Sequence, residues 1–346
     1  MSDDWGSVRI RSKKDQQSLI DKGLRIANRF DQFDALETNE DLELLFDVLT
    51  QHKDKNGNHP VITAVTNVAN PDFHRIQENS FEHYYYKTVD HCYRDTPDSD
   101  RVLGLVQQGI DQRIFIPQSH GREHLQINWW MKELQNPNSF ARHVFDHEFF
   151  FIPGSKMSNN YRNRGVGAAF DVWDQEDLDS HKVTLKSSLK KFEKVFGYKS
   201  VSFTPPAMFY HSSLETQMYS HGVKWLDVGR FFKTPRVGGG ERWQLNYLGR
   251  RKKSGLQVLV RNAVFEPNLH GVSGSVDHCM KRIDTAFKHR QPAIISNHRA
   301  AFVGGIDDNN RSQGLKALNH LLTKILKAWP DVEFLSMPEF SKSIDQ

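Results

Sequence analysis

Short strand-like segments alternate with amphipathic helical patterns along most of the chain, and this alternation restricts the fold more than any other feature. Strands are predicted where apolar and β-branched residues stand between turn formers, at 60–65, 114–116, 201–203, 225–228, 256–260, 293–295 and 332–335. Helical periodicity and N-cap residues predict helices at 39–53, 100–112, 125–134, 177–196, 277–289 and 314–328. The pattern predicts an α/β fold with a parallel sheet or a (β/α) barrel.

The chain has 346 residues, enough for one large domain or two smaller ones. It shows no internal repeat and no low-complexity tract. Longer loops or insertions are predicted near 146–171 and 231–253, and neither has the composition of a domain linker. We therefore expect a single domain over 1–346.

Composition excludes several classes of protein. The net charge of +4 is spread over 46 basic and 42 acidic residues, so no nucleic-acid partner is indicated, and the basic run 250–253 is interpreted as a solvated turn. Cys92 and Cys279 stand far apart, which indicates neither a disulfide framework nor a thiolate zinc site. No apolar run approaches the length of a membrane span. Polar residues follow Met1 directly, so we expect no secretory signal and a cytoplasmic protein.

Polar residues with chemical potential follow several of the predicted strands. His120 comes after 114–116, Pro205 after 201–203 and His298 after 293–295, while Asp227 lies on a strand. The carboxyl ends of parallel strands meet at one edge of a sheet, where such folds carry their active sites. One site built from distant segments is the expectation.

Two histidines and two carboxylates make a metal site the leading interpretation. His120 and His124 stand four residues apart, so in a helix they would share one face about 5–6 Å apart. Asp3 and Asp4 are neighbours, and successive strand residues point in different directions, so one is able to bind an ion while the other acts as a base. Two His and one carboxylate form a common catalytic metal set. A charged terminal tail and a chance spacing are the alternatives.

The order of these residues resembles that of the polysaccharide deacetylase (NodB-homology) family. Ser2-Asp3-Asp4-Trp5-Gly6 resembles the first motif, TFDDG, and His120-Gly121-Arg122-Glu123-His124 the second, H-S/T-x-x-H. Phe203-Thr204-Pro205-Pro206, Trp225-Leu226-Asp227 and Ser296-Asn297-His298 stand where the third, fourth and fifth motifs are expected. The later part of the chain is similar to a divergent bacterial branch of the family.

The resemblance implies a distorted (β/α) barrel, with its first strand reduced or missing, that removes N-acetyl groups from an amino sugar in a polysaccharide, oligosaccharide or glycoconjugate. It implies a divalent metal, Zn²⁺ first and Co²⁺, Ni²⁺ or Mn²⁺ as alternatives. By position, Asp4, His120 and His124 would bind the metal, Asp3 would be the base, His298 would protonate the leaving amine, and Asp227 would orient His298. Trp5, Arg122, Pro205 and Arg299 would contact the saccharide.

The third motif departs from the family in two ways. Phe203 replaces an arginine that pairs with the base, so Asp3 would lose its charge partner unless another basic residue, such as Arg122 or Arg299, substitutes. Pro206 has no N–H to offer an oxyanion, so either Ala207 donates in its place, the metal alone stabilises the oxyanion, or the chemistry differs. Two alternatives therefore stay open: a catalytically inactive glycan-binding protein on the same fold, and a metal-dependent hydrolase of another C–N or ester bond.

Overall fold

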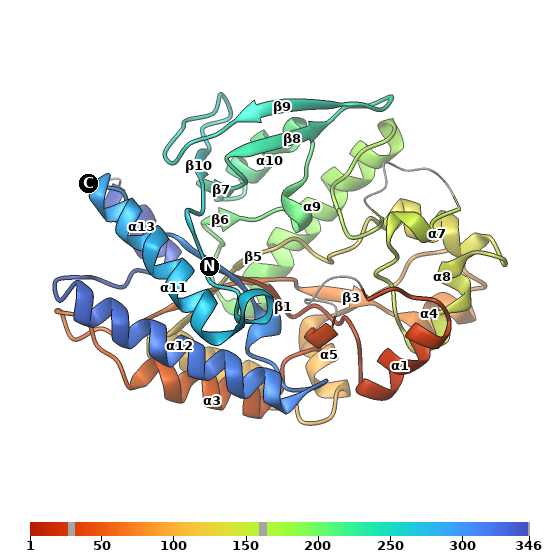
Figure 1. Cartoon of the computed structure of the whole chain (residues 1–346). Helices are drawn as coiled ribbons and strands as arrows, with labels where there is room; N and C mark the ends of the chain where they lie inside the picture. The colour runs from red at the N-terminus through yellow and green to blue at the C-terminus, as the bar shows by residue number, and fades with distance from the viewer. Residues whose placement is uncertain (27–31, 159–164, 345–346) are drawn as a thin grey trace.

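Parallel strands form the central sheet of the computed structural model, which describes residues 1–26, 32–158 and 165–344 (Figure 1). The strands of this sheet are β1 (Ser2–Trp5), β2 (Ile62–Thr66), β5 (Phe115–Ser119), β6 (Ser202–Phe203), β7 (Trp225–Asp227), β10 (Gln257–Leu259), β11 (Ala263–Val264) and β12 (Ile295–His298). Their order is β10-β7-β6-β5-β2-β1-β12-β11, with parallel pairing between neighbours. The sheet curls into half a barrel, and the predicted fold class, an α/β fold of the distorted (β/α)-barrel type, is confirmed.

The first strand is short, but it is present and lies inside the sheet. In β1, Ser2 pairs with Ala64 of β2 on one side and with Asn297 of β12 on the other. Of the two alternatives, a reduced or a missing first strand, the structure has the reduced one. Two neighbouring strands hold the segment that carries Asp3 and Asp4.

Helices connect the strands and cover the sheet. They are α1 (Lys13–Asp21), α3 (Asn39–Thr50), α4 (Phe73–Glu78), α5 (Val89–Asp95), α6 (Val102–Asp111), α7 (Ile127–Gln135), α8 (Phe140–His143), α9 (Gln175–Phe196), α10 (Glu215–Ser220), α11 (Pro267–Lys288), α12 (Asp308–Ala328) and α13 (Met337–Ile344). The largest apolar cluster joins α3, α6, α11 and α12 to β1, β2 and β5. None of the helices in the described ranges is long and apolar enough to cross a membrane.

Two predictions about single segments are wrong. Residues 332–335 are not a strand, because side chains use the backbone of Phe334: its N–H donates to Asp54 and its carbonyl accepts from Arg113. Helix α11 begins ten residues before the predicted start at Asp277, and the first part is separated by Gly271, whose φ of 67° is not helical.

The segments predicted as loops or insertions, 146–171 and 231–253, contribute no strand to the main sheet in their described residues. Residues 231–253 form the antiparallel hairpin of β8 (Phe231–Pro235) and β9 (Glu241–Leu245), and a second small pair joins β3 (Ala69–Pro71) to β4 (Tyr86–Thr88). The described part of 146–171 holds short 3₁₀ turns, and its residues 159–164 lie outside the described ranges. The single catalytic domain over 1–346 stays a prediction.

Candidate active site

A backbone distortion in β1 places Asp3 and Asp4 at the carboxyl edge of the sheet. The pairing of β1 with β2 shifts register between Ser2 and Trp5, and Asp4 has a φ of 74°, a left-handed conformation that is rare outside glycine. Gly6 follows with a φ of 73°, and a Cβ there would lie 2.5 Å from the carbonyl oxygen of Asn67. The chain therefore turns sharply after β1, and Asp4 no longer follows the strict alternation of a regular strand.

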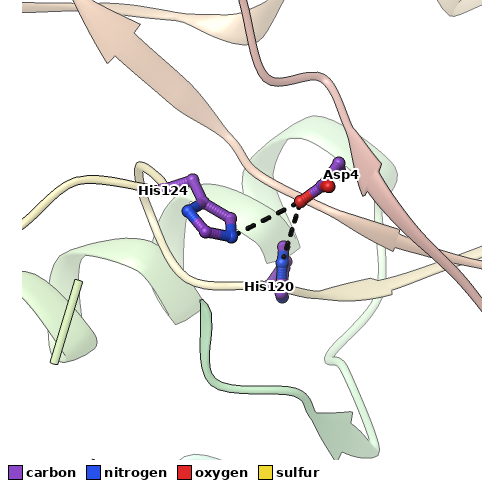
Figure 2. A group of neighbouring side chains, drawn as sticks. All are labelled: Asp4, His120 and His124. Carbon is purple, nitrogen blue, oxygen red and sulfur yellow. Dashed lines mark ion pairs between the residues drawn. The ribbon is translucent and has the colours of Figure 1, made fainter. Parts of the chain in front are cut away.

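Asp4, His120 and His124 converge as a candidate metal centre (Figure 2). The Nε2 atoms of His120 and His124 lie 3.3 Å and 3.5 Å from the same Asp4 oxygen, Oδ1. Two ligands bound tetrahedrally to one zinc ion lie about 3.4 Å apart, given bond lengths near 2.0–2.1 Å. Both distances to Asp4 match that spacing, and all three donor atoms lie within 4.8 Å of one another.

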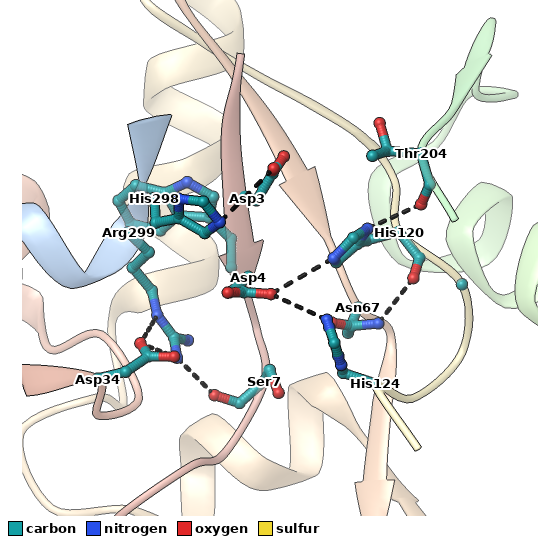
Figure 3. Close-up of polar contacts among 12 residues, drawn as sticks. Asp3, Asp4, Ser7, Asp34, Asn67, His120, His124, Thr204, His298 and Arg299 are labelled. Carbon is teal, nitrogen blue, oxygen red and sulfur yellow. Dashed lines mark hydrogen bonds and ion pairs between the residues drawn. The ribbon is translucent and has the colours of Figure 1, made fainter. Parts of the chain in front are cut away.

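Hydrogen bonding fixes the ring of His120 in the form that binds a metal. Its Nδ1 donates to the carbonyl oxygen of Thr204 at 2.7 Å, which leaves Nε2 facing Asp4 (Figure 3). Burial lowers the pKa of His124 well below its usual range, and the nearby Arg9 charge lowers it further. Its Nδ1 is buried without a hydrogen-bond partner among the described residues. His124 therefore suits the neutral, ligating state, and the Thr204 contact of His120 directs its Nε2 at the same carboxylate.

The two histidines meet through a loop. Residues 120–126 lie between β5 and α7 with no helical turn, so the prediction that helix spacing aligns the pair is wrong. Gly121 has a φ of 90°, and the carbonyl of Arg122 accepts from the N–H groups of Val68 and Ala69. These contacts bring the rings to a centroid distance of 5.1 Å.

Asp3 is paired with Arg261, which sequence reasoning did not assign. Two terminal nitrogens of Arg261 donate to the two Asp3 oxygens at 2.6 Å each, and Arg261 also binds Asp227 at 2.6 and 2.8 Å. Burial alone would raise the pKa of Asp3, but the charge and hydrogen bonds of Arg261 outweigh it and lower that pKa. Another basic residue thus substitutes for the missing arginine, but it is Arg261 and neither Arg122 nor Arg299.

Glu266 holds His298, in the role predicted for Asp227. Nδ1 of His298 lies 2.6 Å from Glu266 Oε1, and its Nε2 lies 4.0 Å from Asp3 Oδ2. Burial would lower the pKa of His298, but the hydrogen bond and charge of Glu266 raise it to about 9. Asp227 instead accepts from Arg261 and from the Thr204 hydroxyl. Its predicted orienting role is therefore wrong.

The structure excludes two of the four predicted saccharide contacts. Trp5 is 1% exposed and packs edge-on against Phe115, so it is a core residue and no sugar platform. Arg299 is 0% exposed and binds Asp34 and Glu37, which excludes a substrate contact. Arg122 pairs with Glu123 and lies over the Tyr86 ring. Pro205 follows the carbonyl that fixes His120, and its contact with a saccharide stays a prediction.

The buried charges around these residues do not balance. Ion pairs link six carboxylates, Asp3, Asp4, Asp34, Glu37, Asp227 and Glu266, to three guanidiniums, Arg9, Arg261 and Arg299, and to His298. With His298 protonated, the cluster keeps two negative charges. Unbalanced charge is costly away from water, and one divalent cation would neutralise it. The donor set and the charge both fit a divalent metal.

Sequence reasoning missed Arg261, Glu266 and Arg9. Arg261 comes two residues after β10, and Glu266 comes two residues after β11, so both stand at carboxyl ends of strands. Their places just after strands were the sequence signal that could have identified them as site residues. Arg9 follows β1 by four residues, in a loop that carries no such signal.

No family model matches the chain, and no curated protein matches it. Solved structures similar to it include two proteins assigned as polysaccharide deacetylases. The one from Mycobacterium smegmatis is 10% identical, with a TM-score of 0.42 over 88% of this chain and 77% of that one. The one from Pseudomonas aeruginosa is 8% identical, with a TM-score of 0.45 over 97% and 82%.

A GH57 branching enzyme from Thermococcus kodakaraensis is 11% identical, with a TM-score of 0.48 over 97% of this chain and 69% of that one. At such identities and TM-scores, these likenesses assign no activity to the chain.

Proposed function

We propose that the chain is a metal-dependent hydrolase that removes N-acetyl groups from an amino sugar of a polysaccharide, oligosaccharide or glycoconjugate. The observation that carries the proposal is the convergence of Asp4, His120 and His124, with Asp3 and His298 beside them. The motif resemblance supports the choice of substrate. A bound Zn²⁺, or Co²⁺, Ni²⁺ or Mn²⁺ in its place, would polarise the acyl carbonyl and acidify a water molecule.

Asp3 is the proposed general base. Its carboxylate is buried and kept ionised by Arg261, so it is able to accept a proton from the attacking water at neutral pH. The same pairing fixes its direction, since both oxygens bind guanidinium nitrogens. Arg261 thus limits how strongly basic Asp3 becomes.

His298 is the proposed general acid. Its Nδ1 is held by Glu266, which leaves the proton on Nε2 facing the side of the site where Asp3 lies. A pKa raised to about 9 keeps the ring protonated at neutral pH, ready to give that proton to the leaving amine. Asp3 and His298 thus divide the two proton transfers.

The segment after β6 favours a second candidate, the hydrolysis of another C–N or ester bond. Pro205 and Pro206 have no N–H, and the N–H of Met208 donates to the Pro205 carbonyl at 2.7 Å. An oxyanion donor is typically worth about 100- to 1,000-fold in rate. A more reactive ester would need that donor less than an amide does.

Acetate release from N-acetylhexosamine oligomers, with Zn²⁺, Co²⁺ or Ni²⁺ added, tests the proposal. We expect Asp3→Asn to lower kcat about 100-fold or more and His120→Ala to abolish metal-dependent turnover. Asp179→Asn, on the exposed side of α9, is the matched control and should keep full activity.

Acetate release from an O-acetylated saccharide alone would support the ester candidate. Binding of the oligomers without any hydrolysis would refute the enzymatic proposal in favour of a glycan-binding protein.

A further inference from the structure

A positively charged side chain approaches the oxygen that both histidines of the candidate metal centre face. Nη2 of Arg9 lies 3.4 Å from Asp4 Oδ1, and His120 and His124 lie 3.3 and 3.5 Å from the same atom. The side chain of Arg9 is 6% exposed. A guanidinium keeps its charge at any working pH and has no lone pair to give a metal, so it is no ligand.

Packing holds the guanidinium of Arg9 at this place. Its central carbon lies 4.0 Å from the centroid of the Phe151 ring, and its Nε lies 3.5 Å from Asp34 Oδ2. Phe151 in turn occupies the space beside Gly167, where a Cβ would lie 2.2 Å from the ring. Arg9 therefore has little room to withdraw when another cation approaches Asp4.

The contacts of Arg9 leave its charge incompletely neutralised. Both carboxylates lie at 3.4–3.5 Å, beyond the distance of a tight charged hydrogen bond. Nε is buried and has no hydrogen-bond partner among the described residues. Asp34 also accepts two hydrogen bonds from Arg299, whose Nη2 and Nε lie 2.7 and 3.0 Å from its Oδ1. Much of the positive charge of Arg9 is therefore available to interact with the carboxylate of Asp4.

We propose that Arg9 is a positioning residue that competes with the metal ion for Asp4 and so weakens metal binding at Asp4, His120 and His124. The inference rests on the metal centre of the proposed function. Two cations close to one carboxylate repel each other strongly where water is excluded. The site would then fill only at a raised free-metal concentration and would exchange its ion readily.

The dissociation constant for Zn²⁺, measured in competition with a chromophoric chelator, tests this. We expect Arg9→Met, which keeps the apolar stem and removes the charge, to bind Zn²⁺ about 10- to 100-fold more tightly, the size typical of residues that contact metal ligands. Arg9→Lys should restore the wild-type value within about threefold, because it retains the charge. Arg311→Met, a buried arginine paired with Asp41, is the control and should change nothing.

Equal or weaker Zn²⁺ binding by Arg9→Met would overturn the proposal. Should that variant not fold, Arg9→Gln removes the same charge and carries the same expectation. Absence of binding by both the wild type and the charge-free variant overturns the metal centre as well. Tighter binding without acetate release leaves the inference standing and refutes only the deacetylase.

Discussion

His298 in the metal-free protein should titrate near pH 9, and this follows from one contact. Glu266 lies 2.6 Å from Nδ1 of His298 and raises its pKa from an ordinary 6.5 to about 9, against the lowering effect of burial. At about 1.4 kcal/mol for each pH unit, the protonated ring contributes about 3 kcal/mol to folding. The His298 side chain is 27% exposed, so solvent reduces this to about 1.5–3 kcal/mol.

The sign of this contribution is fixed by the raised pKa. The stabilisation is fully present below pH 6.5, where the unfolded ring is also protonated, and is lost as pH rises through 9. Glu266→Gln removes the carboxylate that raises the pKa of His298, so the variant should lose this pH-dependent stabilisation. The difference in unfolding free energy between wild type and variant should therefore be about 1.5–3 kcal/mol larger at pH 6 than at pH 10.

NMR titration of the His298 ring in chelator-treated protein measures the pKa directly, and urea unfolding at pH 6 and pH 10 measures the free energies. In Glu266→Gln the midpoint should fall from about 9 towards the ordinary 6.5, because burial is then opposed only by the more distant carboxylates of Asp3 and Asp4. A wild-type midpoint below about 7, or one unchanged in the variant, would refute the assignment of Glu266.

Two further variants test the buried ion pairs and the turn after β1. Arg261→Met leaves Asp3 and Asp227 buried without their guanidinium partner and should cost about 3–5 kcal/mol in urea unfolding. Arg94→Met, at an exposed arginine, should cost under about 0.5 kcal/mol, and a loss below about 1 kcal/mol for Arg261→Met would contradict the pairing. Gly6→Ala should lower the unfolding free energy by about 2–4 kcal/mol. Gly57 has a similar positive φ but open space around it, so Gly57→Ala should lower it by only about 1–2 kcal/mol. Equal losses would contradict a clash between a Cβ at position 6 and the Asn67 carbonyl.

The sequence predicted where the site lies better than which residues pair within it. Asp227, His298 and His120 stand at or after strand ends in the sequence, and the structure places all three at the carboxyl edge of the sheet. Strand propensity and turn residues are local properties, so this much was readable. Assigning Asp227 to His298 failed because pairing depends on strand order, which local patterns do not contain.

The three residues of the candidate metal centre show the same limit at the level of the backbone. His120 and His124 were chosen correctly as a cluster with Asp4, but for a helical reason that the loop does not satisfy. The left-handed φ of Asp4 also has no signal in the sequence, since glycine is the residue expected there. Strain at such a position is tolerated where β2 and β12 hold the strand on both sides.

Strand order explains why Arg261 became the link between two halves of the site. Strands β10 and β11 are the two edges of the sheet, and Arg261 lies in the short segment that joins them. From there it reaches Asp227 at the end of β7 and Asp3 within β1, and these two strands are four places apart in the sheet. Backbone pairing does not close the half barrel between its edges. Instead, the buried guanidinium of Arg261 links β1 to β7 through ion pairs with Asp3 and Asp227. The same charge that keeps Asp3 ionised therefore also connects the two sides of the half barrel.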